Sequence, residues 1–386
     1  LIDDVQITFT TYRPDTDYTT LVDAYLAHNQ GLTGDGIAVA VVDTGLGFEG
    51  NVFYDADNYQ SWIGSNYLYV PTLYDAIADV QTTGDYSIRQ STDASGHGTH
   101  MSSIIGSSQR NNENGRKNGV APLADIIPVK AFGSNGAGAY ADVIRGIDWI
   151  VANKDTYNIR VLNASFFSEA KSYYWEDPLN QAVMAAWDAG IVVVASAGNI
   201  DPASNAPFSI GVPGNVPYVI TVGAMTDAYT PDNPDDDYVM SFSALGPTYE
   251  RFVKPDLVAP GGHMRSYMPA DGQIVADHPE FFDTGDYFTM SGTSQSAAVV
   301  SGIVALMLEA DPTLSPDDVK CRLAASAQPA RDGNGDLISP IFQQGSGLVN
   351  AYDAVNSNAS GCANQGLDIS KDIAGTEHYI GEAVHV

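Results

Sequence analysis

The chain has 386 residues, of which 44% are hydrophobic, so it can form one large α/β domain or two smaller ones with a sizeable core. Its net charge is −30 with only 17 basic residues, and such a surface repels phosphate backbones and anionic lipids. We therefore expect neither nucleic acid nor a membrane as a partner. No apolar run approaches the roughly 18 residues that a membrane span requires.

Five apolar runs have the length of buried strands. They show little alternation of polar and apolar residues, which is typical of strands covered on both faces in a parallel sheet. The runs are residues 37–42, 126–130, 159–162, 191–195 and 218–222.

Helix signals stand between several of these runs. One apolar face predicts a helix over 140–151. Asp177 as N-cap, Pro178 in the first turn and Gly190 after the end delimit a second helix. The alternation of strand and helix predicts an α/β fold with a doubly wound, mostly parallel sheet sandwiched by helices.

Three further signals lie in the second half of the chain. Small residues beside large apolar ones predict an interior helix over 295–310, with Ser294 at its N-terminus, where free amides and the helix dipole favour negative charge. A capping pattern at 315–318 begins another helix. From residue 365 on, the signals are weak, and we expect a strand pair or a tail.

The two cysteines, Cys321 and Cys362, could close a loop of about 40 residues, worth roughly 4 kcal/mol if they pair. Exported proteins form such bonds and cytosolic proteins seldom do. The chain also begins at Leu1 without a leader, which fits a product trimmed from a longer precursor, although a chosen boundary would look the same.

Three separate segments supply an acid, an imidazole and a hydroxyl. They are Asp43 after the first strand, His97 in a Gly-His-Gly-Thr-His segment, and Ser294 in a Ser-Gly-Thr-Ser segment. A serine nucleophile needs a base to remove its proton and a carboxylate to hold that base in the right tautomer. The trio is therefore chemically complete for acyl transfer.

These segments resemble those of the subtilases, the subtilisin family of serine proteases, in which the chain order is also acid, histidine, serine. Four further segments are similar to subtilase segments and occur in the same order: 192–199, 218–224, 254–261 and 345–351. The resemblance implies a subtilisin-like fold with a catalytic domain at 34–357. Residues 1–33 would be an N-terminal extension packed on it, and residues 358–386 a C-terminal extension of uncertain structure.

The resemblance also implies the site residues. Ser294 attacks the scissile carbonyl, His97 transfers the proton and Asp43 orients His97. Asn199 and the backbone N–H of Ser294 stabilise the oxyanion. His100 is expected to be structural. We thus expect a secreted serine endopeptidase, monomeric and made with an N-terminal propeptide, which needs no cofactor for catalysis and acts on proteins or peptides.

Two segments are expected to bind the substrate side chain that precedes the cut. In the family, the matching segments form two walls of a pocket, and the peptide pairs with them as an added strand. One wall is the strand edge Asn163-Ala164-Ser165, which Phe166 and Phe167 follow, and the other is Ser196, Ala197 and Gly198. Many relatives have Leu-Gly-Gly where this chain has Phe166-Phe167-Ser168, so these rings either narrow the pocket or point into the core.

Structural calcium is common in the family, and one loop offers oxygen ligands at alternate positions: Asp332, Asn334 and Asp336. The loop lacks the glycine and the glutamate that an EF-hand places later. The loop can be interpreted as a calcium site or as an ordinary Asn/Gly turn, and the pattern favours the turn. No His/Cys spacing typical of zinc is present.

Two rival hypotheses remain. Asp-Thr-Gly occurs at Asp43 and again at Asp283, as in an aspartic protease, but this predicts an all-β fold and leaves His97 and Ser294 unexplained. The other rival is an inactive scaffold on the subtilase fold, which has no need for an intact set of Asp43, His97, Ser294 and Asn199.

Overall fold

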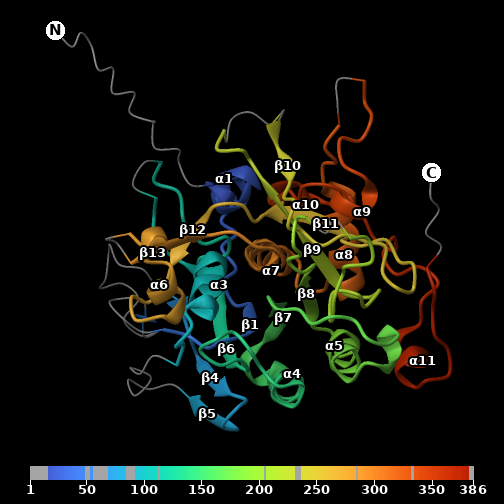
Figure 1. Cartoon of the computed structure of the whole chain (residues 1–386), viewed down its shortest axis with the longest axis horizontal. Helices are drawn as coiled ribbons and strands as arrows, with labels where there is room; N and C mark the ends of the chain where they lie inside the picture. The colour runs from blue at the N-terminus through green and yellow to red at the C-terminus, as the bar shows by residue number, and fades with distance from the viewer. Residues whose placement is uncertain are drawn as a thin grey trace.

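The apolar runs of the sequence form the central strands of one large, mostly parallel sheet in the computed structural model of the chain (Figure 1). The structure describes residues 16–47, 53–54, 68–83, 92–111, 114–203, 206–230, 236–283, 286–331 and 334–381. Its strands are β1 (Ala38–Asp43), β2 (Phe53–Tyr54), β3 (Leu68–Tyr69), β4 (Thr72–Asp75), β5 (Val80–Thr83), β6 (Asp125–Lys130), β7 (Ile159–Ala164), β8 (Val192–Ser196), β9 (Ile220–Thr226), β10 (Tyr238–Val239), β11 (Leu257–Pro260), β12 (Met264–Tyr267) and β13 (Tyr287–Met290).

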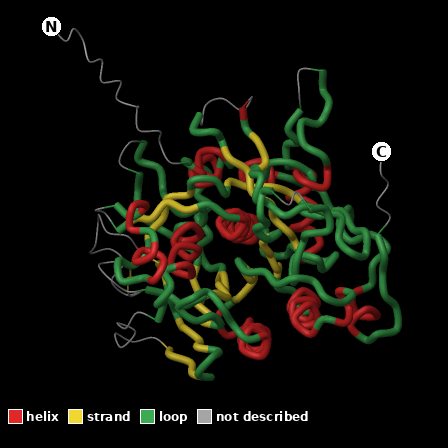
Figure 2. The backbone as a smooth tube through the Cα atoms, viewed as in Figure 1, coloured by secondary structure: helices red, strands yellow, loops and turns green. Residues whose placement is uncertain are grey.

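Helices flank the sheet (Figure 2). They are α1 (Tyr18–Leu21), α2 (Ala24–Asn29), α3 (His97–Gly106), α4 (Tyr140–Tyr157), α5 (Pro178–Asp188), α6 (Gln273–Asp277), α7 (Thr293–Ala310), α8 (Pro316–Ser326), α9 (Ile341–Gln344), α10 (Ala351–Asn356) and α11 (Ile369–Ile373).

The strand order of the main sheet is β10-β9-β8-β7-β1-β6-β3-β2, with β11 beside β9. β1 pairs in parallel with β6 and β7, and β8 pairs in parallel with β7 and β9. Helices α3 and α7 pack together on these strands, and α4 and α5 pack together as a second pair. The predicted doubly wound, mostly parallel α/β sheet is confirmed.

Helix α7 is the central helix of the core, as its small residues predict. It is long and apolar enough to cross a membrane by length and composition alone, but 83% of it is buried inside the protein. A Cβ atom on Gly302 would stand 2.6 Å from Cβ of Val120, so only glycine lets the neighbouring segment approach this closely. The apolar character of α7 is accounted for by packing.

Several elements differ from the predicted ones. β9 spans Ile220–Thr226 and not 218–222, because its later residues pair with β10 and β11. α4 continues past residue 151 until Asn158, which adopts a left-handed conformation with φ of 50°. Among the described residues after 364, the chain forms the short helix α11 and not a strand pair.

Both ends of the described chain pack on the α/β core. The backbone N–H of Ala351, at the start of α10, donates to Val22 O at 2.7 Å, and Asn350 Nδ2 donates to Asp23 Oδ2 at 2.8 Å. Near the other end, the buried carboxylate of Asp372 accepts hydrogen bonds from Tyr174 and Tyr218 hydroxyls. The division into an extension, a catalytic domain at 34–357 and a second extension stays a prediction.

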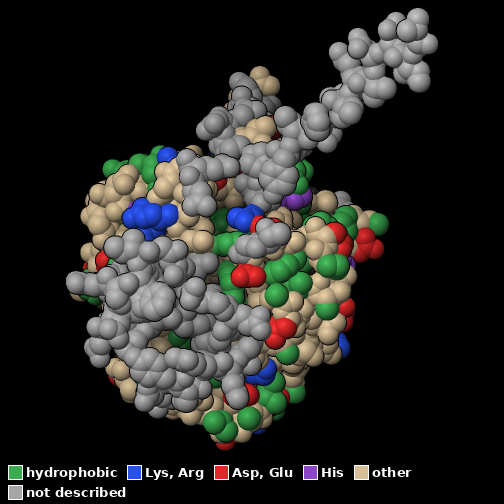
Figure 3. Space-filling model, turned by 90° about the vertical axis from the view of Figure 1, so that its left-hand side faces the viewer, with side chains coloured by type: hydrophobic (Ala, Val, Ile, Leu, Met, Phe, Trp, Pro, Cys, Tyr) green, Lys and Arg blue, Asp and Glu red, His purple; other side chains and the backbone are tan. Residues whose placement is uncertain are grey.

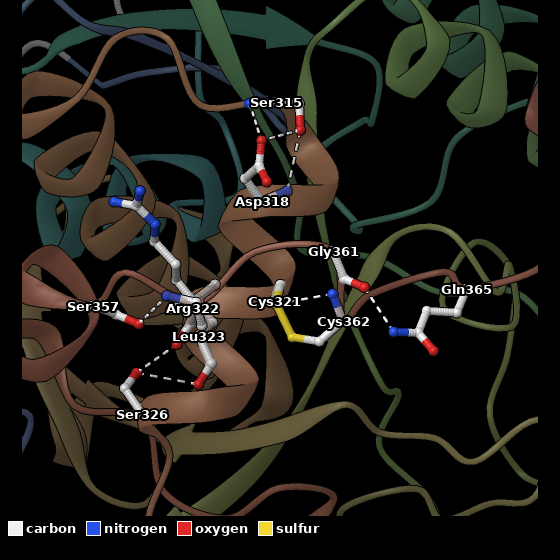
Figure 4. The surroundings of a disulfide bond; sticks show 11 residues. Ser315, Asp318, Cys321, Arg322, Leu323, Ser326, Ser357, Gly361, Cys362 and Gln365 are labelled. Atoms are coloured by element: carbon white, nitrogen blue, oxygen red, sulfur yellow. Dashed lines mark hydrogen bonds between the residues drawn. A yellow bond between two sulfur atoms is a disulfide. The ribbon is translucent and has the colours of Figure 1, made fainter.

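A disulfide joins Cys321 on α8 to Cys362, which precedes α11 (Figure 4). The same view shows the start of α8, where Ser315 and Asp318 form the predicted capping box. The disulfide thus attaches the segment that leads to α11 to a well-capped helix of the core.

Candidate active site

The candidate residues meet at one edge of the sheet because of the topology. Parallel strands place their carboxyl ends at the same edge, and ligands of open α/β sheets bind there. Asp43 is the last residue of β1, and Ser165 and Asn199 follow β7 and β8 within a few residues. Helices α3 and α7 begin at His97 and Thr293.

Asp43 and His97 form a hydrogen-bonded pair. Nδ1 of His97 lies 2.8 Å from Oδ1 and 2.9 Å from Oδ2 of Asp43, whose carboxylate also accepts from the backbone N–H of Thr44 at 2.7 Å. The Asp43 side chain is 4% exposed and that of His97 is 20% exposed. A proton on Nδ1 leaves the Nε2 lone pair of His97 available to accept another proton.

Burial and charge act in opposite directions on the imidazole. Burial alone lowers the pKa of His97, but the Asp43 carboxylate, helped by Asp93, more than offsets it, so the pKa of His97 is raised above its ordinary value. The pair is therefore built to stabilise an imidazolium.

Ser294 is the second residue of α7 and shares a cleft with this pair. The cleft has a volume of about 370 Å³, and Asp43, His97 and Ser294 all line it. The hydroxyl Oγ of Ser294 donates to the backbone O of Ser165 at 3.0 Å, and the Ser165 hydroxyl donates to the backbone O of Ser294 at 2.8 Å. Transfer of the serine proton to His97 requires the hydroxyl to turn from Ser165 toward the ring, as is common in substrate-free sites.

Asn199 is fixed by α7 through one end of its amide. Its Oδ1 accepts from the backbone N–H and from the hydroxyl of Thr293, both at 3.0 Å. Nδ2 has no hydrogen-bond partner among the described residues, and Asn199 is exposed. The N–H of Ser294 belongs to the first turn of α7, where helical N–H groups lack an intrahelical acceptor. Two donors are thus available for an anion beside Ser294.

The two segments predicted to bind substrate lie differently around the cleft. Ser165, Phe166 and Phe167 line it. Ser196 and Ala197 are 1% and 0% exposed, and Ser196 Oγ donates to Phe166 O at 3.1 Å, so these residues hold the first segment from behind. Gly198 lies against the ring of Phe167.

His100 is buried and packs away from the pair. Its Nε2 lies 3.0 Å from the backbone O of Phe288 on β13, and burial lowers its pKa to about 3. Burial therefore favours the neutral form of this ring near neutral pH, and the structural role of His100 stays a prediction.

Sequence reasoning missed Asp93, which is fully buried four residues before His97. Its carboxylate accepts five hydrogen bonds, from Thr44 Oγ1, the backbone N–H groups of Ser95, Gly96 and Thr99, and Thr99 Oγ1. An acidic residue just before an apolar helix is an N-terminal signal that could have identified it.

The second Asp-Thr-Gly segment has other partners. Asp283 forms an ion pair with Arg265 on β12, while Asp43 pairs with His97, and Thr284 and Gly285 lie outside the described residues. The α/β sheet also contradicts the all-β fold that an aspartic protease requires. The paired-carboxylate hypothesis is therefore rejected.

The predicted calcium loop is only partly described, since Asp332 lies outside the described residues. In the described part of this loop, the Arg331 guanidinium donates a hydrogen bond to the backbone O of Gly335 at 2.7 Å. Gly335 adopts a φ of 88°. Within the described ranges, no group of three or more His, Cys, Asp or Glu side chains is arranged to hold a metal ion.

The chain matches a family model described as "Subtilase family" over residues 34–352. Among curated proteins, "Serine protease AprX" of Bacillus subtilis (strain 168) is 36% identical over 337 residues, which cover 85% of this chain and 68% of that protein. "Subtilisin NAT" of Bacillus subtilis subsp. natto is 30% identical over 327 residues, with coverage of 85% and 68%.

Solved structures agree with this match. Fervidolysin of Fervidobacterium pennivorans, described as a keratinolytic enzyme related to subtilisin, has a TM-score of 0.63 at 26% identity. The alignment covers 86% of this chain and 44% of fervidolysin, so this chain spans less than half of that relative. The Clostridium perfringens CspB protease has a TM-score of 0.68 at 20% identity, covers 88% of this chain and 99% of its own, and shows the shared fold alone.

Proposed function

Because this chain belongs to the subtilase family and is a subtilisin-type serine peptidase, we propose that it is an endopeptidase that uses Ser294, His97 and Asp43 as its catalytic triad. The observation that carries this assignment is the double contact of Asp43 with Nδ1 of His97 in the cleft that Ser294 also lines. An enzyme of this class acts on protein or peptide substrates.

In the proposed mechanism, substrate binding displaces the Ser294 hydroxyl from Ser165 O, and Oγ then attacks the carbonyl carbon while Nε2 of His97 takes its proton. The backbone O of Ser165 is thereby free to accept an N–H group of the substrate backbone. His97 later gives the proton to the leaving amine, and Asp43 stabilises the imidazolium in between.

The oxyanion is assigned to Nδ2 of Asn199 and the backbone N–H of Ser294. The two hydrogen bonds from Thr293 to Oδ1 support this, because they orient the amide so that Nδ2 is the free end. A donor held in place before the reaction needs no reorganisation when the charge develops.

Substrate binding is assigned to the edge formed by Ser165, Phe166 and Phe167, with Ser196, Ala197 and Gly198 behind it. We also propose that the enzyme is a secreted monomer made with an N-terminal propeptide. The disulfide supports the extracellular setting, since such bonds persist in oxidising compartments. If the protein binds structural calcium, we assign it to Asp332, Asn334 and Asp336. The favoured alternative for this loop is an ordinary Asn/Gly turn without a metal.

The test is labelling with a fluorophosphonate at pH 8, followed by peptide mapping of the adduct. We expect one adduct, on Ser294, and none in Ser294→Ala, which should fold normally and lose several orders of magnitude in turnover. Absence of any adduct on folded protein would favour the inactive scaffold, and near-normal turnover of Ser294→Ala would overturn the mechanism.

A further inference from the structure

The ring of Phe167 lies against two backbone positions that have no side chain. A Cβ atom built on Gly198 would stand 3.2 Å from Cδ2 of Phe167, and one built on Gly211 would stand 2.8 Å from the same atom. A side chain on Gly198 would require the ring to shift by a few tenths of an ångström, and one on Gly211 would also stand 2.4 Å from the backbone O of Ser168. Phe167 therefore occupies the space that these two glycines leave open.

This position spans the two segments that the proposed function assigns to substrate binding. Phe167 belongs to the first segment, and Gly198 belongs to the second and precedes Asn199. The segment of Gly211 is joined to the first by Ser168 and Val212, which exchange two backbone hydrogen bonds of 2.9 and 2.8 Å. Two neighbouring backbone segments thus flank the ring, and one of them leads to Asn199, the proposed oxyanion donor.

The neighbouring Phe166 behaves differently. Its ring packs against Phe132 with centroids 5.1 Å apart and joins the main hydrophobic core. Both phenylalanines line the cleft that contains His97 and Ser294, but Phe167 is 47% exposed and is not part of that core. Of the two adjacent phenylalanines, only Phe167 enters the space between the segments.

We propose that Phe167 fills the pocket for the substrate side chain that precedes the scissile bond, so that the enzyme selects alanine, glycine or serine there over large side chains. This inference rests on the proposed function, since the pocket has this meaning only where a peptide is cut. A large side chain could enter only if the ring moved off both glycines, losing its contacts with them.

The first experiment compares two peptide p-nitroanilides that differ only in having Ala or Phe before the cut. For the wild-type enzyme we expect kcat/KM to be at least ten-fold higher for Ala, because a misfit of a single methylene in a pocket already changes this ratio by roughly 10- to 200-fold. Equal or better cleavage after Phe would overturn the proposal, because it would show that the ring gives way.

The second experiment removes the ring in Phe167→Ala and Phe167→Gly. We expect the ratio of kcat/KM for the Phe substrate to kcat/KM for the Ala substrate to rise at least ten-fold, and more in the glycine variant. An unchanged ratio in variants that unfold at the wild-type temperature would overturn the proposal. The wild-type ratio decides it alone if neither variant folds.

Phe208→Gly is the matched control. Phe208 is 57% exposed, is not among the residues that line the cleft, and has a φ of 62°, which glycine adopts readily. It should leave the Ala-to-Phe ratio unchanged. Fluorophosphonate labelling of Ser294 distinguishes failure of this inference from failure of the proposed function. If Ser294 is labelled but the Ala-to-Phe ratio is the same in the Phe167 variants, only the selection by Phe167 is overturned. If there is neither an adduct nor cleavage, the proposed function is overturned as well.

Discussion

Asp93 and Thr99 are joined twice, because Oδ2 of Asp93 accepts from the backbone N–H of Thr99 at 2.8 Å and from its hydroxyl at 2.6 Å. Oδ1 of the same carboxylate accepts from Gly96 N at 2.8 Å and from Thr44 Oγ1 at 2.7 Å. Gly96 precedes His97 and Thr44 follows Asp43. One buried carboxylate therefore fixes both members of the acid–histidine pair.

The first prediction concerns Asp93→Asn, in which an amide replaces an acceptor that faces only donors. We expect a loss of unfolding free energy on the order of 3 kcal/mol and a fall in kcat of about 100-fold from misplacement of His97. Urea unfolding and steady-state kinetics measure the two effects.

The matched control for Asp93 is Asp75→Asn, since Asp75 accepts from Ile77 N and Ala78 N in an exposed turn. It should change neither quantity appreciably. Wild-type kcat in Asp93→Asn would contradict a positioning role for Asp93, even if stability fell.

The second prediction separates the two ends of the Asn199 amide. Asn199→Ala should lower kcat by about 10²–10³ with little change in KM, because one oxyanion donor is lost. Asn199→Asp keeps an acceptor for Thr293 but cannot donate, so it should retain the wild-type unfolding temperature and lose at least as much kcat. An Asp variant with wild-type kcat would remove Asn199 from the oxyanion site.

The third prediction is the pH dependence of kcat/KM. His97 must be neutral to act as a base, and Asp43 raises the pKa of His97 above its ordinary 6.5. The acidic limb of kcat/KM should therefore be centred above pH 6.5, not below it. A neutral peptide substrate avoids titration of the substrate, and a limb centred below pH 6 would contradict the assignment.

The same shift fixes how the pair contributes to stability. A histidine whose pKa is raised on folding adds stability that is fully present below its unfolded pKa and is lost as pH rises through the folded value. In Asp43→Asn this contribution should disappear, so the difference in unfolding free energy between wild type and variant should be larger at pH 5.5 than at pH 8.5. NMR titration of His97 should show a lowered pKa in the variant.

The fourth prediction concerns the disulfide. Replacing Cys321 and Cys362 together by serine should lower the unfolding free energy by about 4 kcal/mol, as expected for a loop of this length. Fluorophosphonate labelling of Ser294 should be unaffected, because neither cysteine lines the cleft. Hydrogen exchange in residues 365–381 should speed up, and unchanged exchange would mean that Asp372 and its tyrosine partners hold this segment without the disulfide.

The net charge of −30 gives the protein an acidic surface. In the described part of the face shown in Figure 3, acidic side chains are interspersed with hydrophobic and neutral ones. Salt screens interactions between such exposed charges more strongly than the contact between Asp43 and His97, whose side chains are only 4% and 20% exposed.

The sequence by itself determined the α/β sheet, the limits of α5, the start of α8, and the identity of Asp43, His97, Ser294 and Asn199 as candidates. These features depend on local signals: apolar runs, caps, and short motifs in a set order. Asp93 is bound by Ser95, Gly96 and Thr99, which lie within six residues of it, but also by Thr44, which lies 49 residues earlier, and only the fold brings this fourth partner to it.

Only the tertiary structure decided where the side chains of Phe166 and Phe167 go. Adjacent residues after a strand point in different directions, and the choice between core and pocket depends on what each ring meets. Phe166 meets Phe132, whereas Phe167 meets the bare backbone of Gly198 and Gly211, which are 31 and 44 residues further along the chain. Contacts between such distant residues set the shape of the pocket, and no local pattern encodes them.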